Sequence, residues 1–231
     1  MLLEAKGICK SYGPRAVLDH VSFTIPESGI TGLIGPNGAG KTTLFEALSG
    51  LLPVDAGEVL FRGESLNGRD RKPALFYMPD GIQPWAEQPV GWLLRFYSGL
   101  YGAPAHRVEQ LTSALQLGDF RRARAGSLSK GEWKRFLLAM SLLTPQPLLL
   151  LDEPFDGLDY RQTQDAMSLL KAEHERAFFL SIHQLNDAAR VCSRLILMSR
   201  GRVVGEGSLD ELRGKAKVES GGLEEIFLAL T

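Results

Sequence analysis

The sequence predicts an α/β fold with a mostly parallel core sheet, an N-terminal antiparallel β region and an inserted helical subdomain. Three observations lead to this prediction. Over residues 147–199, short apolar runs typical of buried strands alternate with amphipathic helical segments, as in a parallel sheet covered on both faces. Further upstream, the glycine-rich stretch "GPNGAGKTT" at 35–43 connects a strand-like run to a helical one. Between these regions, residues 84–146 carry helical patterning without clear strands.

Local patterns set the expected elements in chain order. β-rich runs are separated by the turn-forming stretches "SYGPR" and "PESG", and a helix is expected from Lys41 with Gly50 near its end. The apolar face of that helix comprises Leu44, Ala47, Leu48 and Leu51. The other expected elements are strands at 2–9, 16–25, 29–35, 57–63, 147–154, 177–183 and 194–199, helices at 160–175, 184–192 and 222–230, and a hairpin over 199–207.

The chain of 231 residues is long enough to bury one large α/β core, and it contains no visible repeat or low-complexity segment. We therefore expect a single domain over 1–231, with a core lobe formed by 1–83 and 147–231 and a helical subdomain over 84–146. One helix of this subdomain is clearly amphipathic and ends before Pro145. Its apolar stripe comprises Trp133, Phe136, Leu137, Met140 and Leu143.

Composition excludes several classes of protein. The formal net charge of −1 argues against a dedicated nucleic-acid binder, because counterion release requires a strong excess of Lys and Arg. The short basic run at 121–124 is interpreted as a solvated face. The two cysteines, Cys9 and Cys192, fit buried thiols in a reducing compartment. Neither a signal peptide nor an apolar run of about 20 residues is visible, so we expect a cytoplasmic protein that reaches a membrane only through a partner.

The stretch at 35–43 satisfies the phosphate-loop pattern G-x-x-x-x-G-K-[ST] in its required position between a strand and a helix. Backbone N–H groups of such a loop turn towards a β-phosphate, and the helix N-terminus adds partial positive charge. Lys41 would reach the β- and γ-phosphates, Thr42 would bind Mg²⁺ and Thr43 would donate to the α-phosphate. The other residues expected to bind nucleotide here are Gly35, Pro36, Asn37, Gly38, Ala39 and Gly40.

An acidic pair follows the strand-like run "LLLL". Asp152 would emerge at the carboxyl end of a buried strand, where α/β sheets bind ligands, and could hold Mg²⁺ through water. Glu153 would orient or deprotonate the attacking water. On its own such a pair is often only a turn, but beside a phosphate loop it predicts a Mg²⁺–nucleotide site.

A second anion-binding feature is the stretch "SLSKGEWKRF" at 127–136. Ser129 and Glu132 have the spacing of a capping box, which satisfies the free N–H groups at a helix start. Taken alone, this pattern requires no ligand, and the residues do not decide between a cap and a second phosphate-binding end.

The order of motifs resembles the nucleotide-binding subunit of ATP-binding cassette (ABC) transporters over essentially the whole chain. The motifs are "GPNGAGKTT", "LSKGE", "LLLLDEP", "DGLD" and "SIH". Tyr12 of "KSYG" matches the aromatic residue on which the family stacks adenine. His183 of "SIH" matches the catalytic switch histidine that senses the γ-phosphate, although a lone histidine would be interpreted as structural.

The resemblance implies a P-loop NTPase fold and a dimer in which each ATP lies between the glycine loop of one subunit and the signature helix of the other. Ser129 and Gly131 would then contact ATP bound by a second nucleotide-binding subunit, in a homodimer or heterodimer, and Asp159 would lie in the loop that crosses the dimer. The implied activity is Mg²⁺-dependent ATP hydrolysis that drives transport through integral membrane permease subunits at the inner face of the cell membrane. The ending "GLEEIFLALT" is similar to export-type members.

This chain departs from the family pattern at three places. Where the family has a glutamine before the helical subdomain, the stretch "ALFYMPDGIQPW" has Asp80. An aspartate can accept from water or approach Mg²⁺, but it cannot donate and it adds negative charge. Either Asp80 takes over this catalytic and metal-binding position, which the spacing favours, or Gln83 reaches in, or the site is tuned for slow hydrolysis. In the signature, Lys130 replaces a glycine and Glu132 a glutamine. Lys130 either adds charge near the partner's ATP or points into water. Asp156 stands where serine is more usual. We expect retained but slow hydrolysis.

The stretch at 85–102 concentrates aromatic residues, namely Trp85, Trp92, Phe96, Tyr97 and Tyr101. We expect them to fill the core of the helical subdomain. The alternative is a groove that receives a short helix from a membrane subunit.

Two other classes of function remain as rivals. One is a non-transport relative that acts on DNA or ribosomes, against which the short spacer between the two motifs and the near-neutral charge argue. The other is a small-molecule phosphotransferase, which would need neither "LSKGE" nor His183.

Overall fold

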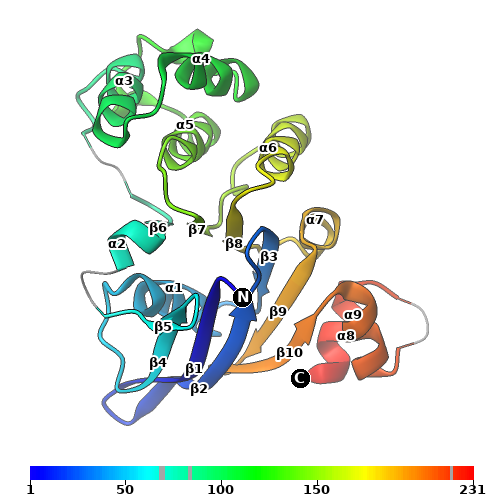
Figure 1. Cartoon of the computed structure of the whole chain (residues 1–231). Coiled ribbons are helices and arrows are strands. Elements are labelled where there is room, and N and C mark those ends of the chain that lie inside the picture. The colour runs from blue at the N-terminus through cyan, green and yellow to red at the C-terminus, as the bar shows by residue number, and fades with distance from the viewer. Residues whose placement is uncertain (68–70, 83–84, 219–220) are drawn as a thin grey trace.

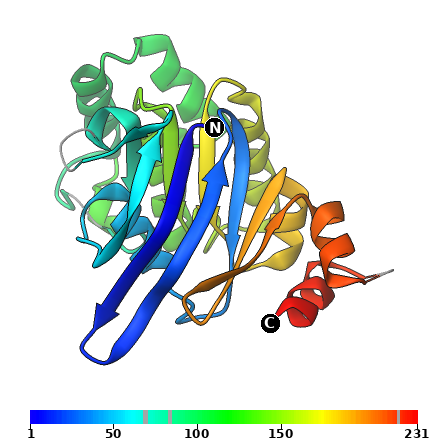
Figure 2. The same ribbon diagram turned by 60° about the horizontal axis from the view of Figure 1, so that its bottom comes forward.

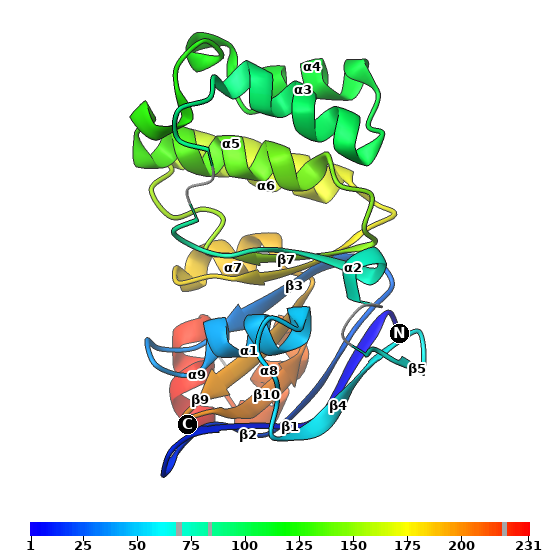
Figure 3. The same ribbon diagram turned by 90° about the vertical axis from the view of Figure 1, so that its left-hand side faces the viewer.

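The computed structural model of the chain describes residues 1–67, 71–82, 85–218 and 221–231. Figures 1 and 3 show an upper helical lobe, a central sheet and a lower sheet stacked in layers. This arrangement confirms the predicted α/β fold with a mostly parallel core sheet, an antiparallel N-terminal region and inserted helices.

The N-terminal sheet is antiparallel, with the strand order β2-β1-β4-β5 among the described residues. It is built from the runs that the sequence analysis interpreted as β-rich. Its strands are β1 (Leu3–Tyr12), β2 (Arg15–Ile25), β4 (Ala56–Phe61) and β5 (Glu64–Ser65).

The central sheet has the order β10-β9-β3-β8-β7-β6 within the described part of the chain. Its strands are parallel apart from the β9–β10 hairpin. The strands are β3 (Gly29–Ile34), β6 (Leu75–Met78), β7 (Leu148–Asp152), β8 (Ala177–Ser181), β9 (Arg194–Ser199) and β10 (Arg202–Gly207). The carboxyl ends of β3, β6, β7 and β8 therefore meet at one edge of the sheet, where a ligand is expected to bind.

Helices cover both faces of the central sheet. Those packed against the sheet include α1 (Lys41–Ser49), α5 (Lys130–Leu142), α6 (Tyr160–Ala172) and α7 (Leu185–Val191). The other helices are α2 (Arg71–Ala74), α3 (Val90–Tyr101), α4 (Ala105–Ala114), α8 (Leu209–Ala216) and α9 (Leu223–Leu230). Strand β7 shows why both faces must be covered. Leu148 and Leu150 belong to the core that contains α1, whereas Leu149 and Leu151 belong to the core beneath α5 and α6. All four side chains are fully buried, as the run of leucines predicts.

Helix α1 lies between the two sheets (Figure 3). Leu44, Ala47 and Leu48 are buried, as expected, but Leu51 is 71% exposed. The reason is that Gly50 ends the helix in the left-handed conformation, which turns the chain away before Leu51 can join the apolar face.

The helical lobe contains α3, α4 and α5, and the expected apolar stripe of α5 is buried. The expectation that the aromatic residues fill this lobe is wrong for Trp85, Trp92 and Phe96, which are 48%, 42% and 42% exposed. On α3 the residues that face the core are aliphatic instead: Leu93 and Leu94 are buried, and the helix packs against α4 and α5. The rings of Trp92 and Phe96 stack on the outer face of α3, with centroids 5.2 Å apart.

At the C-terminal end, the predicted hairpin is formed by β9 and β10, and α8 and α9 pack beside it (Figure 2). Helix α8 was not anticipated, although Ser208 and Glu211 form a capping box at its start. Within the described ranges, no helix combines the length and the apolar character needed to cross a bilayer.

Candidate nucleotide site

A cavity of about 390 Å³ lies at the carboxyl edge of the central sheet. It brings together most of the residues that the sequence nominates for the site, although they are far apart in the chain. These are Tyr12, Asn37, Gly38, Gly40, Lys41, Thr42, Thr43, Asp80, Asp152, Glu153 and His183. Gly35, Pro36 and Ala39 belong to the same loop but are not among the described residues that line the cavity. Ser129, Gly131 and Asp159 also lie outside it.

The glycine loop begins at the end of β3 and leads directly into α1. Gly38 and Gly40 have φ of +78° and +102°, a conformation that an L side chain would strain. A Cβ atom on Gly38 would meet nothing within 4 Å, whereas one on Gly40 would lie 2.8 Å from the carbonyl of Val17. The backbone at Gly38 is therefore open to a ligand, and Gly40 fits the loop closely against β2.

Lys41 is 8% exposed, and its ammonium group turns back onto the loop. Its Nζ donates to the carbonyl oxygens of Gly35 at 2.7 Å and Pro36 at 3.3 Å. Burial lowers the pKa of Lys41, while the charges of Glu153 and Asp152 oppose this shift. The loop thus holds a cation at the base of the cavity, next to the start of α1.

Thr42 and Asp152 meet although they are carried by different elements. The Thr42 hydroxyl donates to Oδ2 of Asp152 at 3.0 Å, which joins the first turn of α1 to the end of β7. Asp152 is only 2% exposed. A hydroxyl and a carboxylate placed side by side form an oxygen donor set of the kind that Mg²⁺ uses in proteins.

Ser181 completes the support of the acidic pair, and the sequence analysis missed it. Its side chain is fully buried at the end of β8, where it donates to Oδ1 of Asp152 at 2.5 Å. The same hydroxyl oxygen accepts from the backbone N–H of Glu153 at 2.9 Å. The signal in the sequence was its place at a strand end, two residues before His183.

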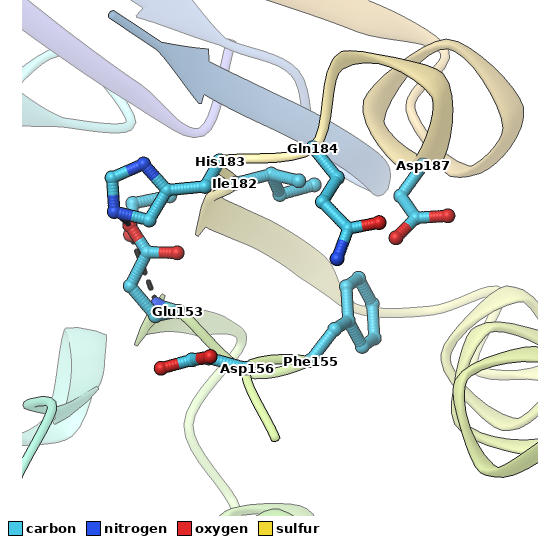
Figure 4. A pocket seen from close by; sticks show the side chains of 8 residues that line it. Glu153, Phe155, Asp156, Ile182, His183, Gln184 and Asp187 are labelled. Carbon is cyan, nitrogen blue, oxygen red and sulfur yellow. Dashed lines mark hydrogen bonds and ion pairs between the residues drawn. The ribbon is translucent and has the colours of Figure 1, made fainter. Parts of the chain in front are cut away.

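Glu153 has a left-handed backbone conformation, with φ of +51°. For a residue other than glycine this conformation is costly, so the surrounding contacts must hold it. Its side chain, 12% exposed, points towards His183, and the two groups lie 2.9 Å apart between Oε1 and Nε2 (Figure 4). Burial raises the pKa of the Glu153 carboxyl, although His183 and Lys41 act in the opposite direction. Such a carboxylate is suited to accept a proton from water.

Asp80 lies just beyond β6 and pairs with a residue that the sequence analysis did not consider. Nζ of Lys134, on α5, donates to Oδ1 of Asp80 at 2.7 Å. Partial burial raises the pKa of Asp80, but the hydrogen bond and the charge of Lys134 outweigh it and leave the pKa below its ordinary value. The alternative residue for this position, Gln83, lies outside the described residues.

The second anion-binding feature does not line this cavity. Ser129 caps α5: its hydroxyl accepts from the N–H of Glu132, and the Glu132 carboxylate accepts from the N–H of Ser129. Gly131 packs against the 156–159 loop, since a Cβ atom on it would lie 2.7 Å from the carbonyl of Gly157. Asp159 caps α6 in a second capping box.

Two of the departures from the family pattern, Lys130 and Asp156, contact each other. Nζ of Lys130 lies 2.6 Å from Oδ2 of Asp156. Both side chains are well exposed, at 64% and 43%, and the pair is therefore expected to contribute little to stability.

Tyr12 lies at the other end of the cavity, where it is 52% exposed, and Arg15 and Val17 lie beside it. Nζ of Lys10 is 5.8 Å from the centre of its ring. An exposed ring at a cavity mouth offers a flat surface for a planar base.

Replacing Ser181 by alanine is expected to reduce ATP turnover by about 10-fold, because the buried contacts that hold Asp152 and the Glu153 backbone are lost. Steady-state ATPase kinetics on the purified variant provide the measurement. The matched control is Ser141→Ala, which removes a buried hydroxyl from α5 that donates to the carbonyl of Leu137, away from the cavity. Equal turnover in wild type and Ser181→Ala would contradict the assignment.

Comparison with known proteins gives a consistent result. A model of the ABC transporter family matches residues 18–156. The chain is 31% identical over 223 residues to the probable multidrug ABC transporter ATP-binding protein YbhF of Escherichia coli (strain K12); the match covers 93% of this chain but 38% of that protein. It is 30% identical over 240 residues to the petrobactin import ATP-binding protein YclP of Bacillus subtilis (strain 168), covering 98% of this chain and 92% of that protein.

A solved structure described as an ATP binding subunit of an ABC transporter matches the fold with a TM-score of 0.88 and 27% sequence identity. The match covers 100% of this chain and 99% of that one. The chain thus spans less than half of the Escherichia coli relative but nearly all of the Bacillus subtilis relative and of this solved structure. The chain belongs to the ABC transporter family, with the fold of its ATP-binding cassette.

Proposed function

We propose that this chain binds ATP with Mg²⁺ and hydrolyses it as the ATP-binding subunit of a transporter. The observation that carries the proposal is the convergence of the glycine loop, Asp152, Glu153 and His183 on one cavity. A cation, a buried metal-binding carboxylate and a second carboxylate with a raised pKa are the groups that phosphoryl transfer to water requires.

The nucleotide would lie along the cavity with its base on Tyr12 and its phosphates at the glycine loop. The N–H groups of Gly38 to Thr43 and the N-terminus of α1 favour negative charge there. Lys41 would leave the carbonyls of Gly35 and Pro36 and donate to the β- and γ-phosphates. Thr43 would donate to the α-phosphate.

Thr42 and Asp152 would hold the metal ion, with Asp80 nearby at the same end of the cavity. Their fit rests on the hydroxyl and the carboxylate that already lie side by side, 3.0 Å apart. When bound, Mg²⁺ would neutralise charge on the β- and γ-phosphates. Ser181 would keep the Asp152 carboxylate oriented towards this position.

Glu153 would take the proton of the attacking water. Its carboxylate is held by the left-handed backbone and lies against His183, so both groups face the end of the cavity where the γ-phosphate would lie. His183 would donate to the γ-phosphate and stay oriented by Glu153. Because a catalytic base works best with a pKa near the operating pH, the raised pKa of Glu153 supports this role.

A second nucleotide-binding subunit would complete the site. Ser129 and Gly131 lie at the start of α5, which offers partial positive charge, yet neither lines the cavity of its own chain. The proposal assigns them to ATP bound by another copy or by a related subunit, with Asp159 in the loop between the two. Ser129 would then serve two roles, because it also caps its own helix.

Membrane permease subunits would contact the outer face of α3 at the inner surface of the cell membrane. Support comes from Trp85, Trp92 and Phe96, whose large apolar side chains are exposed. Such side chains are usually buried in the core or in an interface with another protein. These aromatic residues fit the groove interpretation better than the core interpretation. We propose export as the direction, on the strength of the multidrug relative; the Bacillus relative is named for import.

The proposal is tested by assaying the purified chain for Mg²⁺-dependent release of phosphate from ATP, alone and with a multi-span membrane protein that a neighbouring gene encodes, referred to below as the permease. Turnover that depends on Mg²⁺ and rises with the permease is the expected result. An ATPase-silent chain that transfers phosphate to added small molecules, or that copurifies with nucleic acid or ribosomes, would refute it.

A further inference from the structure

Lys134 is a buried cation that the proposed chemistry does not use. Its side chain is 3% exposed, on a stretch of α5 where Trp133, Phe136 and Leu137 are also buried. A lysine is almost never buried without a partner, because removing an ammonium group from water is costly. Such a position therefore needs a reason beyond packing.

The partners of Lys134 lie at the nucleotide cavity. Its Nζ donates to Oδ1 of Asp80 at 2.7 Å and lies 3.4 Å from the backbone carbonyl oxygen of Asp152. These two residues follow β6 and end β7, respectively. Among the described residues that line the cavity, Asp80 is present and Lys134 is not. It can therefore act on a ligand only through the residues that it holds.

The negative charge of the residues that line this end of the cavity explains why a cation is needed beside Asp80. Asp80, Asp152 and Glu153 contribute three carboxylates to the lining, and the lysine and arginine among the described lining residues are Lys41 and, beside Tyr12, Arg15. A triphosphate would have to approach this negative set, and repulsion between like charges is strong where water is partly excluded. The ammonium group of Lys134, in direct contact with Asp80, compensates the negative charge of that carboxylate.

We propose that Lys134 is a positioning residue of the nucleotide site: it neutralises Asp80 and fixes its carboxylate, so that Asp80 faces the triphosphate end without repelling it. The inference rests on the proposed ATP-binding function. It also ties α5, the helix that begins at Ser129, to the cavity of the same chain through one buried ion pair. The effect is specific for the third phosphate, because the γ-phosphate adds negative charge at the end of the cavity where Asp80 lies.

The test compares the affinities for Mg²⁺–AMP-PNP, a nonhydrolysable ATP analogue, and Mg²⁺–ADP by isothermal titration calorimetry. Lys134→Met keeps the length and apolar stem of the side chain and removes the charge. We expect it to weaken AMP-PNP binding by about 10-fold and ADP binding by less than about 3-fold. Adding Asp80→Asn to Lys134→Met is expected to recover AMP-PNP affinity relative to Lys134→Met alone, because the unpaired carboxylate is removed together with its partner.

The control is Arg107→Met, which removes another lobe-to-core ion pair, Arg107 with Glu173, at the far end of α6 and away from the cavity. It is expected to change thermal stability but not the ratio of the two affinities. If Lys134→Met does not fold, Lys134→Gln, which keeps a hydrogen-bond donor for Asp80 and removes the charge, is expected to show the same selective loss of AMP-PNP affinity, and equal losses of both affinities in it overturn the proposal.

Two other results overturn the inference. Equal losses of AMP-PNP and ADP affinity in Lys134→Met would mean that the lysine only supports the fold. No recovery of AMP-PNP affinity on adding Asp80→Asn to Lys134→Met would mean that the lysine does not act through Asp80. Failure of the wild-type chain to bind either nucleotide would instead refute the proposed function, so the two failures are distinguishable.

Discussion

Replacing Glu153 by glutamine is expected to lower ATP turnover by about 100-fold or more while leaving ATP bound. Glutamine has nearly the same shape, so the contact with His183 and the left-handed backbone held by Ser181 are retained. An amide cannot take the proton of the attacking water. The trapped enzyme should therefore accumulate with ATP rather than ADP, as measured by single-turnover assays and by analysis of the bound nucleotide.

The matched control for this variant is Glu173→Gln, a half-buried carboxylate whose partner is Arg107 and which lies away from the cavity. Unchanged turnover in Glu153→Gln would exclude Glu153 as the base. Burial raises the pKa of Glu153, and the base must be ionised to act. As the pH is lowered, wild-type turnover is therefore expected to start falling at a pH above that at which an ordinary glutamate becomes protonated.

Replacing Lys41 by methionine is expected to weaken ATP binding by about 100-fold or more. The ammonium group is the cation of the glycine loop, and its loss leaves the carboxylates of the cavity unopposed on that side. Ligand binding to a folded protein raises its stability in proportion to the logarithm of ligand concentration over Kd. Wild type should therefore show a rise in Tm with Mg²⁺–ATP that Lys41→Met lacks.

Lys215→Met serves as the control for Lys41→Met, because Lys215 also donates to a backbone carbonyl, that of Glu206, but lies on α8. The Tm of this control should respond to ATP as the wild type does. An ATP-dependent rise in Tm of the same size in Lys41→Met would contradict the role of the loop lysine.

The sequence predicts the fold and the glycine loop well because the responsible interactions are local. The four successive leucines before Asp152 point to both faces of a strand, so that both faces must be buried. The loop at 35–43 needs glycine at Gly38 and Gly40, where the backbone φ is positive. The resemblance of the motif order to ABC proteins is confirmed by the family match.

Residues that act through long-range contacts could not be predicted in this way. Ser181 and Lys134 meet Asp152 and Asp80 only after the strands and α5 are assembled, and neither has a spacing that points to the other. Trp92 and Phe96 share a helix face, but periodicity alone does not say whether that face turns inwards. On α3 it is Leu93 and Leu94 that face the core, which leaves Trp92 and Phe96 on the outer face.

The central claim is that ATP is held between two subunits, with donors at the start of α5 acting on the nucleotide of the neighbouring copy. The most direct measurement is the mass in solution of Glu153→Gln with Mg²⁺–ATP, alone and with the permease, beside that of Glu153→Gln/Ser129→Arg. The account predicts twice the mass of a single chain and one ATP per chain for the first variant, and an unpaired chain for the second. Pairing of both variants with equal affinity, or an ATP-loaded Glu153→Gln that stays single even with the permease, would contradict it.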